Sequence, residues 1–171
     1  LKANANISKV FYDGQYVEGS DAAPDCYSND GVAPAADAAN PQCTSCAACP
    51  KNVWGSKISP SGSKLKACAD VRRVAILPEG DMDYSPILLR VPGASLSDLA
   101  NYGKALKQRG IPYAAVVTKL SFDPDAAFPK IMFQFDRVLT QDEMAKIAER
   151  MGEPIIDDIL GNTSRGAPAL A

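Results

Sequence analysis

Apolar and polar residues recur in the second half of the chain with the two periods that distinguish strands from helices. Alternation is clearest over 130–139, where Ile131, Phe133 and Phe135 share one face and the intervening residues share the other. Such alternation is typical of a strand with one buried face. The other predicted strands are 71–77, 86–91, 113–122 and, at the start of the chain, two short strands joined by a turn near Asp13 and Gly14 within 7–19.

Helical spacing appears in two segments. An apolar stripe predicts a helix over 95–110, with Ser95 as its N-cap and Gly110 at its end. A second helix is predicted from Thr140, where Glu143 completes a capping box, to Gly152. The stripe of the first helix consists of Leu96, Leu99, Tyr102 and Leu106.

The order of these elements predicts a fold that is mainly β with two helices. A capped helix between pairs of strands favours an OB-like antiparallel barrel, into which a cysteine-rich metal-binding loop is inserted. A ferredoxin-like split sheet uses similar pieces and is the alternative. We expect one OB-like DNA-binding domain over 1–152, with 19–70 as the loop and metal-binding insertion, and an acidic-apolar C-terminal tail over 153–171.

Five cysteines and no histidine define the candidate metal chemistry of the chain. Thiols two residues apart can converge on one ion, because a tight turn brings both sulfurs to the same side. Zinc with cysteine-only ligands is the first interpretation, a [4Fe–4S] cluster on the four cysteines of 43–68 is the second, and disulfides or free thiols are the third. Zinc would be held by Cys46, Cys49 and Cys68 with either Cys26 or Cys43 as the fourth ligand, and the sequence leaves this choice open. The candidate ligands are Cys26, Cys43, Cys46, Cys49 and Cys68.

Positive charge is concentrated next to these cysteines. Residues 51–73 carry six basic side chains and one acidic one, in a chain whose net charge is −2. The only tryptophan, Trp54, lies in the same stretch. Lysines beside an aromatic ring suit single-stranded nucleic acid, which offers phosphates and exposed base faces. No pair of acidic residues has the spacing of a two-metal catalytic motif, and the sequence has no histidine to act as a general base, so we expect no enzyme activity.

The segments PDCYSNDGVAP, CPKNVWGS, KAC and VRRVAIL, followed by VVTKLSFD, resemble a group of phage-encoded single-stranded-DNA-binding proteins. The resemblance covers roughly 24–150 and implies work on unwound DNA in replication or recombination, without base-specific chemistry and without catalytic residues. The additional Cys43 departs from the simpler C-x2-CP pattern of that group.

We therefore expect sequence-tolerant binding of single-stranded DNA. The alternatives are a zinc-stapled adaptor for protein interaction or transcription, and an iron–sulfur accessory protein or nuclease. Replication or recombination proteins are expected partners of the C-terminal tail. No apolar run reaches the length of a membrane span, and the expected location is the cytoplasm, that of the host if the protein is phage-encoded. The expected DNA-binding residues are Lys51, Trp54, Lys57, Lys64, Lys66, Arg72, Arg73, Lys119, Phe122 and Lys130, and Tyr27 and Phe128 are further candidates for stacking.

Overall fold

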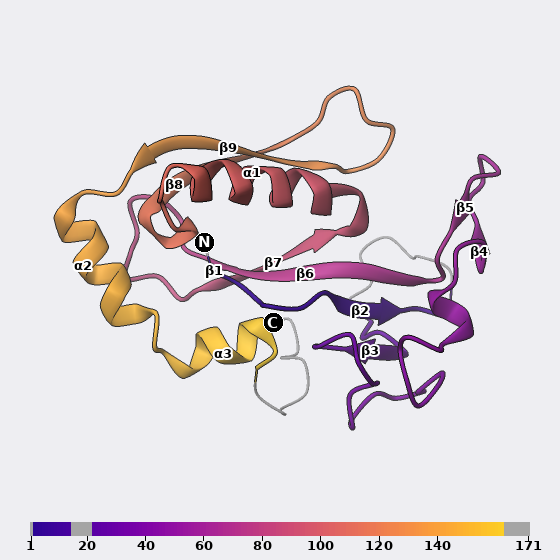
Figure 1. The fold of residues 1–171 in the computed structure, drawn as a ribbon. Helices are drawn as coiled ribbons and strands as arrows, with labels where there is room; N and C mark the ends of the chain where they lie inside the picture. The colour runs from indigo at the N-terminus through magenta and orange to yellow at the C-terminus, as the bar shows by residue number, and fades with distance from the viewer. Residues whose placement is uncertain (1, 15–21, 163–171) are drawn as a thin grey trace.

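The computed structural model describes residues 2–14 and 22–162, and these residues form antiparallel sheets packed with helices (Figure 1). In chain order the strands are β1 (Lys2–Ala3), β2 (Ser8–Phe11), β3 (Cys26–Ser28), β4 (Lys57–Ile58), β5 (Lys64–Leu65), β6 (Cys68–Ile76), β7 (Ile87–Pro92), β8 (Val116–Phe122) and β9 (Ile131–Val138). The helices are α1 (Leu96–Gln108), α2 (Gln141–Arg150) and α3 (Pro154–Leu160).

β6 is the central strand of the five-stranded main sheet. β7 pairs with one edge of β6, and β1 and β2 pair in succession with the other edge. β3 extends the sheet beyond β2. β4 pairs with β5, and β8 pairs with β9, as two separate hairpins. The described strands thus form one main sheet and two separate hairpins that come from different parts of the chain.

Helix α1 lies between the main sheet and the β8–β9 hairpin (Figure 1). Leu99 packs on the sheet against Val74 and Val91, which are fully buried. One and two turns later, Tyr102 and Leu106 contact the hairpin. The predicted stripe is therefore buried between two layers, and α1 holds the hairpin over the sheet.

The opposite face of the main sheet is covered by α3. Ala75 alternates with Val74 along β6 and so faces the other way. It packs with Ile156, Ile159 and Leu160 of α3 in a second buried cluster. The segment that the sequence suggested as the start of an acidic-apolar tail is thus, over α3, part of the folded body.

Except for the short strand expected after Gly14, the predicted strands and both predicted helices are present, and the antiparallel, mainly β class is confirmed. The capping box of Thr140 and Glu143 is present at the start of α2. The Ser95 cap was predicted wrongly: its hydroxyl accepts from the Ile131 amide of β9 (2.8 Å) and caps no helical amide. A short 3₁₀ turn, Gly93–Ser95, leads into α1 instead.

Two features of the predicted architecture differ from the structure. Three helices are present in the described part of the chain where two were expected. The strands described form no closed barrel, because β8 and β9 pair with each other and with no strand of the main sheet. The short strand predicted after Gly14 lies outside the described residues. Over the same described ranges, no helix is long and apolar enough to cross a membrane.

Candidate metal centre and nucleic-acid interface

All five cysteines line one small cavity beside β2 and β3. The strand register pairs Phe11 of β2 with Cys26 of β3 on one side and with Cys68 of β6 on the other. Directly opposed residues share one face of a sheet, so these two thiols flank the Phe11 ring. The three side chains form one buried cluster. The main sheet therefore fixes two of the five thiols.

The other three thiols come from the loop that follows β3. The Cys49 amide donates to the Cys46 carbonyl (3.4 Å), and a 3₁₀ turn over Pro50–Asn52 follows directly. This tight turn brings Cys46 and Cys49 to the same cavity. Cys26, Cys46, Cys49 and Cys68 are between 5% and 7% exposed. Cys43, in the stretch before the turn, is only half-buried.

The five thiols form no disulfides. Burial raises the pKa of Cys68 to about 11, and burial with a hydrogen bond to Cys49 raises the pKa of Cys43 to about 11. Metal binding would therefore have to displace protons. Within the described residues, no three His, Cys, Asp or Glu side chains are arranged as ligands of an ion. The metal centre stays a prediction, supported by the convergence of the thiols alone.

A partly buried polar network ties the cysteine loop to the sheet. Lys9 of β2 donates to the Asn52 side chain (3.0 Å) and forms an ion pair with Asp70 of β6. Asn52 in turn donates to the Cys46 carbonyl (2.8 Å). Lys66 also pairs with Asp70, at 3.1 Å. Burial of Asp70 opposes its ionisation, but the hydrogen bonds from both lysines outweigh that effect and lower its pKa.

Most residues of the segment CPKNVWGS have a structural role, and Trp54 is the exception. Pro50 starts the 3₁₀ turn, and Asn52 makes the contacts above. Gly55 adopts a positive φ of 88° that favours glycine. Ser56 donates to the Lys51 carbonyl and accepts from the Ala67 amide, which closes the loop. Trp54 is 69% exposed and contacts Lys66, whose Nζ lies 5.8 Å from the ring centroid.

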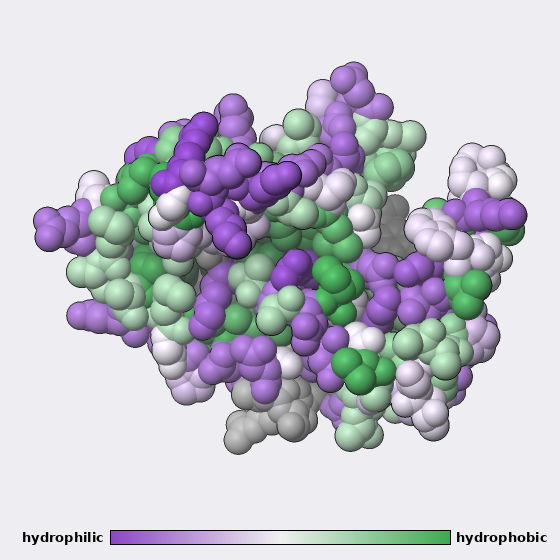
Figure 2. Space-filling model, viewed as in Figure 1, coloured by the Kyte–Doolittle hydropathy of each residue, from purple (hydrophilic) through white to green (hydrophobic). Residues whose placement is uncertain are grey.

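We call residues 53–66 the arm. It is a hairpin of β4 and β5 that closes through Gly62, at a φ of 83°, and through hydrogen bonds between Ser59 and Ser63. In Figure 1 the arm extends from the end of the main sheet, and in the space-filling view of Figure 2 it stands out from the body on the right. From Lys51 to Ala69 the chain contains no acidic residue. The arm is thus an exposed, purely cationic projection.

The register of the arm separates its lysines. Lys57 is opposite Leu65, and Ile58 is opposite Lys64, so Lys57 and Lys64 point to opposite faces. Lys66 is two residues from Lys64 and shares its face, which is the side on which Lys66 covers Trp54. Ile58, Lys64 and Trp54 therefore belong to one face of the arm, and Lys57 belongs to the other.

The two arginines of β6 do not face solvent as binding residues would. Arg72 donates to the Asn4 carbonyl through two nitrogens, at 3.1 and 2.8 Å. Arg73 is 6% exposed and donates to the carbonyls of Ile159 (2.6 Å) and Asp158 (3.2 Å) at the end of α3. Both side chains hold the fold together, so we leave them out of the proposed interface.

The remaining predicted residues lie on the β8–β9 hairpin, away from the arm in the chain. Lys130 is held by Asp98 (3.4 Å) and Asp123 (3.3 Å). Lys119 is exposed, but alternation places it on the opposite hairpin face from Phe122. Phe122 is 67% exposed, and Phe128, in the loop between the strands, is also exposed. The hairpin thus offers rings without available lysines on the same face.

Tyr27 is buried, and its hydroxyl donates to Asp37, so it supports the cysteine loop and offers no platform for a base. The sequence reasoning missed Ile58, which lies exposed on the face of the arm that carries Trp54. It also missed the hydrogen bonds by which Asn52 and Ser56 hold the cysteine loop. The signal for these two was present, because both fall in the CPKNVWGS segment. No sequence pattern singles out Ile58.

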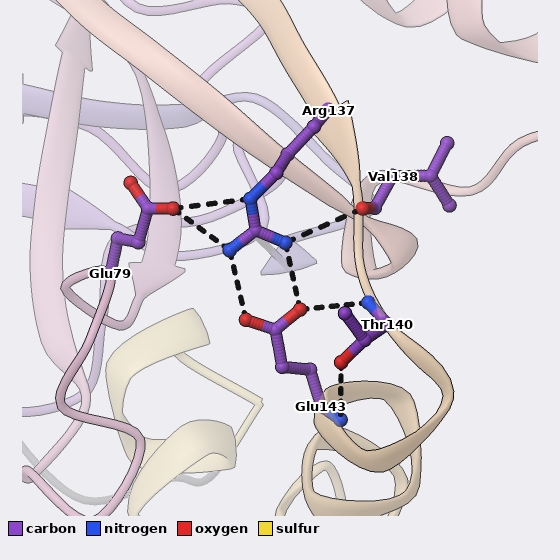
Figure 3. A network of polar contacts seen from close by, with 5 residues as sticks. All are labelled: Glu79, Arg137, Val138, Thr140 and Glu143. Atoms are coloured by element: carbon purple, nitrogen blue, oxygen red, sulfur yellow. Dashed lines mark hydrogen bonds and ion pairs between the residues drawn. The ribbon is translucent and has the colours of Figure 1, made fainter.

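A groove of about 300 Å³ lies between the end of β6, β8 and α2. One wall is fixed by Arg137 of β9, which pairs with Glu79 and with Glu143 of α2, each at 2.8 Å (Figure 3). The hydrogen bonds from Arg137 lower the pKa of Glu143 to about 2. No aromatic side chain of the described residues lines the groove, so it gives bases no platform for stacking.

Comparison with known proteins finds no matching family model, no similar curated protein and no similar solved structure. The resemblance to phage single-stranded-DNA-binding proteins therefore stays a prediction from the sequence.

Proposed function

We propose that the protein binds single-stranded DNA with little sequence preference and acts in DNA replication or recombination without catalysing a reaction. The observation that carries this proposal is Trp54. Around it, each polar or special residue of the CPKNVWGS segment has a structural contact, whereas the tryptophan ring is 69% exposed on a cationic arm. An exposed ring beside lysines is what a sequence-tolerant binder of unpaired strands requires.

In this proposal the Trp54 face of the arm binds the strand. A base stacks on the Trp54 ring, and Lys64 contacts a phosphate next to it. Lys51 is less available, because its Nζ lies 4.9 Å from the centre of the Phe11 ring. An antiparallel sheet that presents a projecting loop is also how OB-type proteins hold single strands. We therefore propose an OB-like mode of binding on an open sheet.

The metal centre has a supporting role. A zinc ion, or alternatively an iron–sulfur cluster, would hold the cysteine loop on the sheet and so fix the base of the arm. Thiols that remain free suit a reducing compartment, which we propose is the cytoplasm, of the host if the gene is phage-borne. Other replication or recombination proteins are proposed partners.

The test is a fluorescence titration of the purified protein with oligo(dT) at low salt, followed through the single tryptophan. We expect quenching of Trp54 and weaker binding to a duplex of the same length. The affinity should fall linearly on a log–log plot against salt concentration, because lysines displace condensed counterions. Absence of binding at low salt would remove the DNA proposal.

A second candidate function is a protein-binding adaptor. It is favoured by exposed aliphatic side chains close to the cysteines, since Val32, Val53 and Ile58 are all solvent-exposed. Val32 is joined to the cysteine loop, because its carbonyl accepts from the Cys46 amide (2.8 Å). Such residues can form the apolar part of a protein interface. The adaptor function takes precedence if oligo(dT) does not bind.

A further inference from the structure

The cavity among the cysteines has room for one small ion. Its volume is about 10 Å³, the smallest that accommodates a single water molecule. A [4Fe–4S] cluster contains eight iron and sulfur atoms, and accommodating them would require Phe11 and the strands on either side of it to move apart. A mononuclear centre is smaller, but it also requires the thiols to move toward a common point, because they are not arranged as ligands of an ion in the described residues.

The five thiols also differ in how they are held. Two of them, Cys26 and Cys68, are fixed by the register of the main sheet. Two more, Cys46 and Cys49, are fixed by the tight turn and its hydrogen bonds to Asn52. Two pairs of thiols from two independent elements are a common way to build a tetrahedral site. Cys43 belongs to neither element and is the most exposed of the five.

We propose that one tetrahedral metal ion of the zinc class is held by Cys26, Cys46, Cys49 and Cys68, and that Cys43 is a spare thiol at the rim. This inference deepens the metal centre of the proposed function and rests on it. Lys9 also lines the cavity, and its positive charge lies beside the negative charge that four thiolates and one divalent ion would carry.

The proposal is tested by metal analysis of the purified protein and of single Cys→Ser variants. We expect one equivalent of zinc, no iron or sulfide, and no colour in the wild type. Cys43→Ser should keep the full equivalent of zinc, and its cobalt-substituted form should show the spectrum of four thiolate ligands. Cys46→Ser and Cys26→Ser should lose stoichiometric zinc. Loss of zinc from Cys43→Ser with retention in Cys26→Ser would overturn the ligand set, and iron with sulfide would overturn the mononuclear centre.

A second measurement covers variants that fail to fold. The folded wild-type protein is treated with a maleimide, and the modified cysteines are located by mass spectrometry before and after a zinc chelator is added. We expect one modified residue, Cys43, before chelation and all five afterwards. Modification of Cys26 before chelation would contradict the proposal. Oligo(dT) binding by the wild type is measured separately: absence of DNA binding with a full equivalent of zinc counts against the function, and loss of zinc from Cys43→Ser with intact DNA binding counts against the ligand set.

Discussion

Replacing Trp54 with alanine separates the stacking contribution from the charge contribution to DNA binding. The ring is 69% exposed and lies under the Lys66 ammonium group, so its removal should change the free energy of unfolding by less than about 0.5 kcal/mol. If a base stacks on it, the free energy of binding should become less favourable by about 1–3 kcal/mol. That loss corresponds to an affinity about 5- to 150-fold lower. The number of phosphate contacts should not change.

The arm provides its own matched control. Lys64 lies on the face that carries Trp54, and Lys57 lies on the opposite face of the same hairpin. Lys64→Ala should reduce the slope of log affinity against log salt by about 0.7, the value for one phosphate contact on a single strand. Lys57→Ala removes the same charge from the same hairpin and should reduce the slope by much less.

The assay is anisotropy of labelled oligo(dT) at several salt concentrations, because Trp54→Ala removes the intrinsic fluorophore. We expect Trp54→Ala to shift the salt plot downward without changing its slope. Equal effects of Lys57→Ala and Lys64→Ala would show that the strand does not lie on one face. An unchanged affinity of Trp54→Ala would refute the stacking contact on which the proposed function depends.

Two further predictions concern the stability of the body. Arg73→Ala should lower the free energy of unfolding by about 3 kcal/mol, because it leaves the carbonyls of Ile159 and Asp158 without their buried donor. Urea denaturation measures this change, with the exposed Lys107→Ala as a neutral control. An unchanged midpoint for Arg73→Ala would contradict the stabilising role of these hydrogen bonds. Glu143 has a folded-state pKa of about 2, below its ordinary value of 4.5, so folding favours its ionised form. Its contribution to stability should be present above about pH 4.5 and lost as the pH falls toward 2; the stability of wild type and Glu143→Gln should therefore converge in acid, and a gap that persists near pH 2 would contradict this.

The long elements could be predicted from the sequence because their patterns are local. The alternation of Ile131, Phe133 and Phe135 and the capping box of Thr140 depend on residues within one element. Ser95 shows the limit of such reasoning. Its hydroxyl is taken by the Ile131 amide, a partner that only the packing of α1 against β9 provides. The absence of a closed barrel from the described strands likewise depends on which edges pair, and the strand sequences do not encode this choice locally.

The kinds of residue that form the candidate site could be predicted from the sequence, but which individual residues belong to it could be predicted less well. Cysteine spacing suggested a metal centre, but the link from Cys26 to Cys68 passes through the register of Phe11, which no spacing reveals. The net charge of 51–73 suggests more basic side chains free to bind DNA than the structure provides. Alternation correctly separates Arg72 from Arg73, yet only the docking of α3 shows that Arg73 is buried. Trp54, which the sequence analysis names as a binding residue, is 69% exposed and so takes no part in the buried thiol cluster.

The binding free energy that one arm can contribute limits the affinity of the protein for DNA. One stacked base contributes about 1–3 kcal/mol, whereas a dissociation constant of 1 μM corresponds to about 8.2 kcal/mol. One ring and one or two lysines fall short of that value. Binding at that affinity would require a second contact, and the exposed Phe122 and Phe128 of the β8–β9 hairpin are candidates on the same molecule. Cooperation between neighbouring copies is the other source.

These two sources predict different results in a titration against oligo(dT) of increasing length. If Phe122 and Phe128 supply the second contact, the affinity should rise steeply until one molecule is spanned and then level off. The double variant Phe122→Ala, Phe128→Ala should abolish that rise at a stoichiometry of one protein per oligonucleotide. If copies cooperate, the rise should begin only when two molecules fit on one strand, and the double variant should retain it. An affinity independent of length would contradict both, because a single arm would then carry all of the binding.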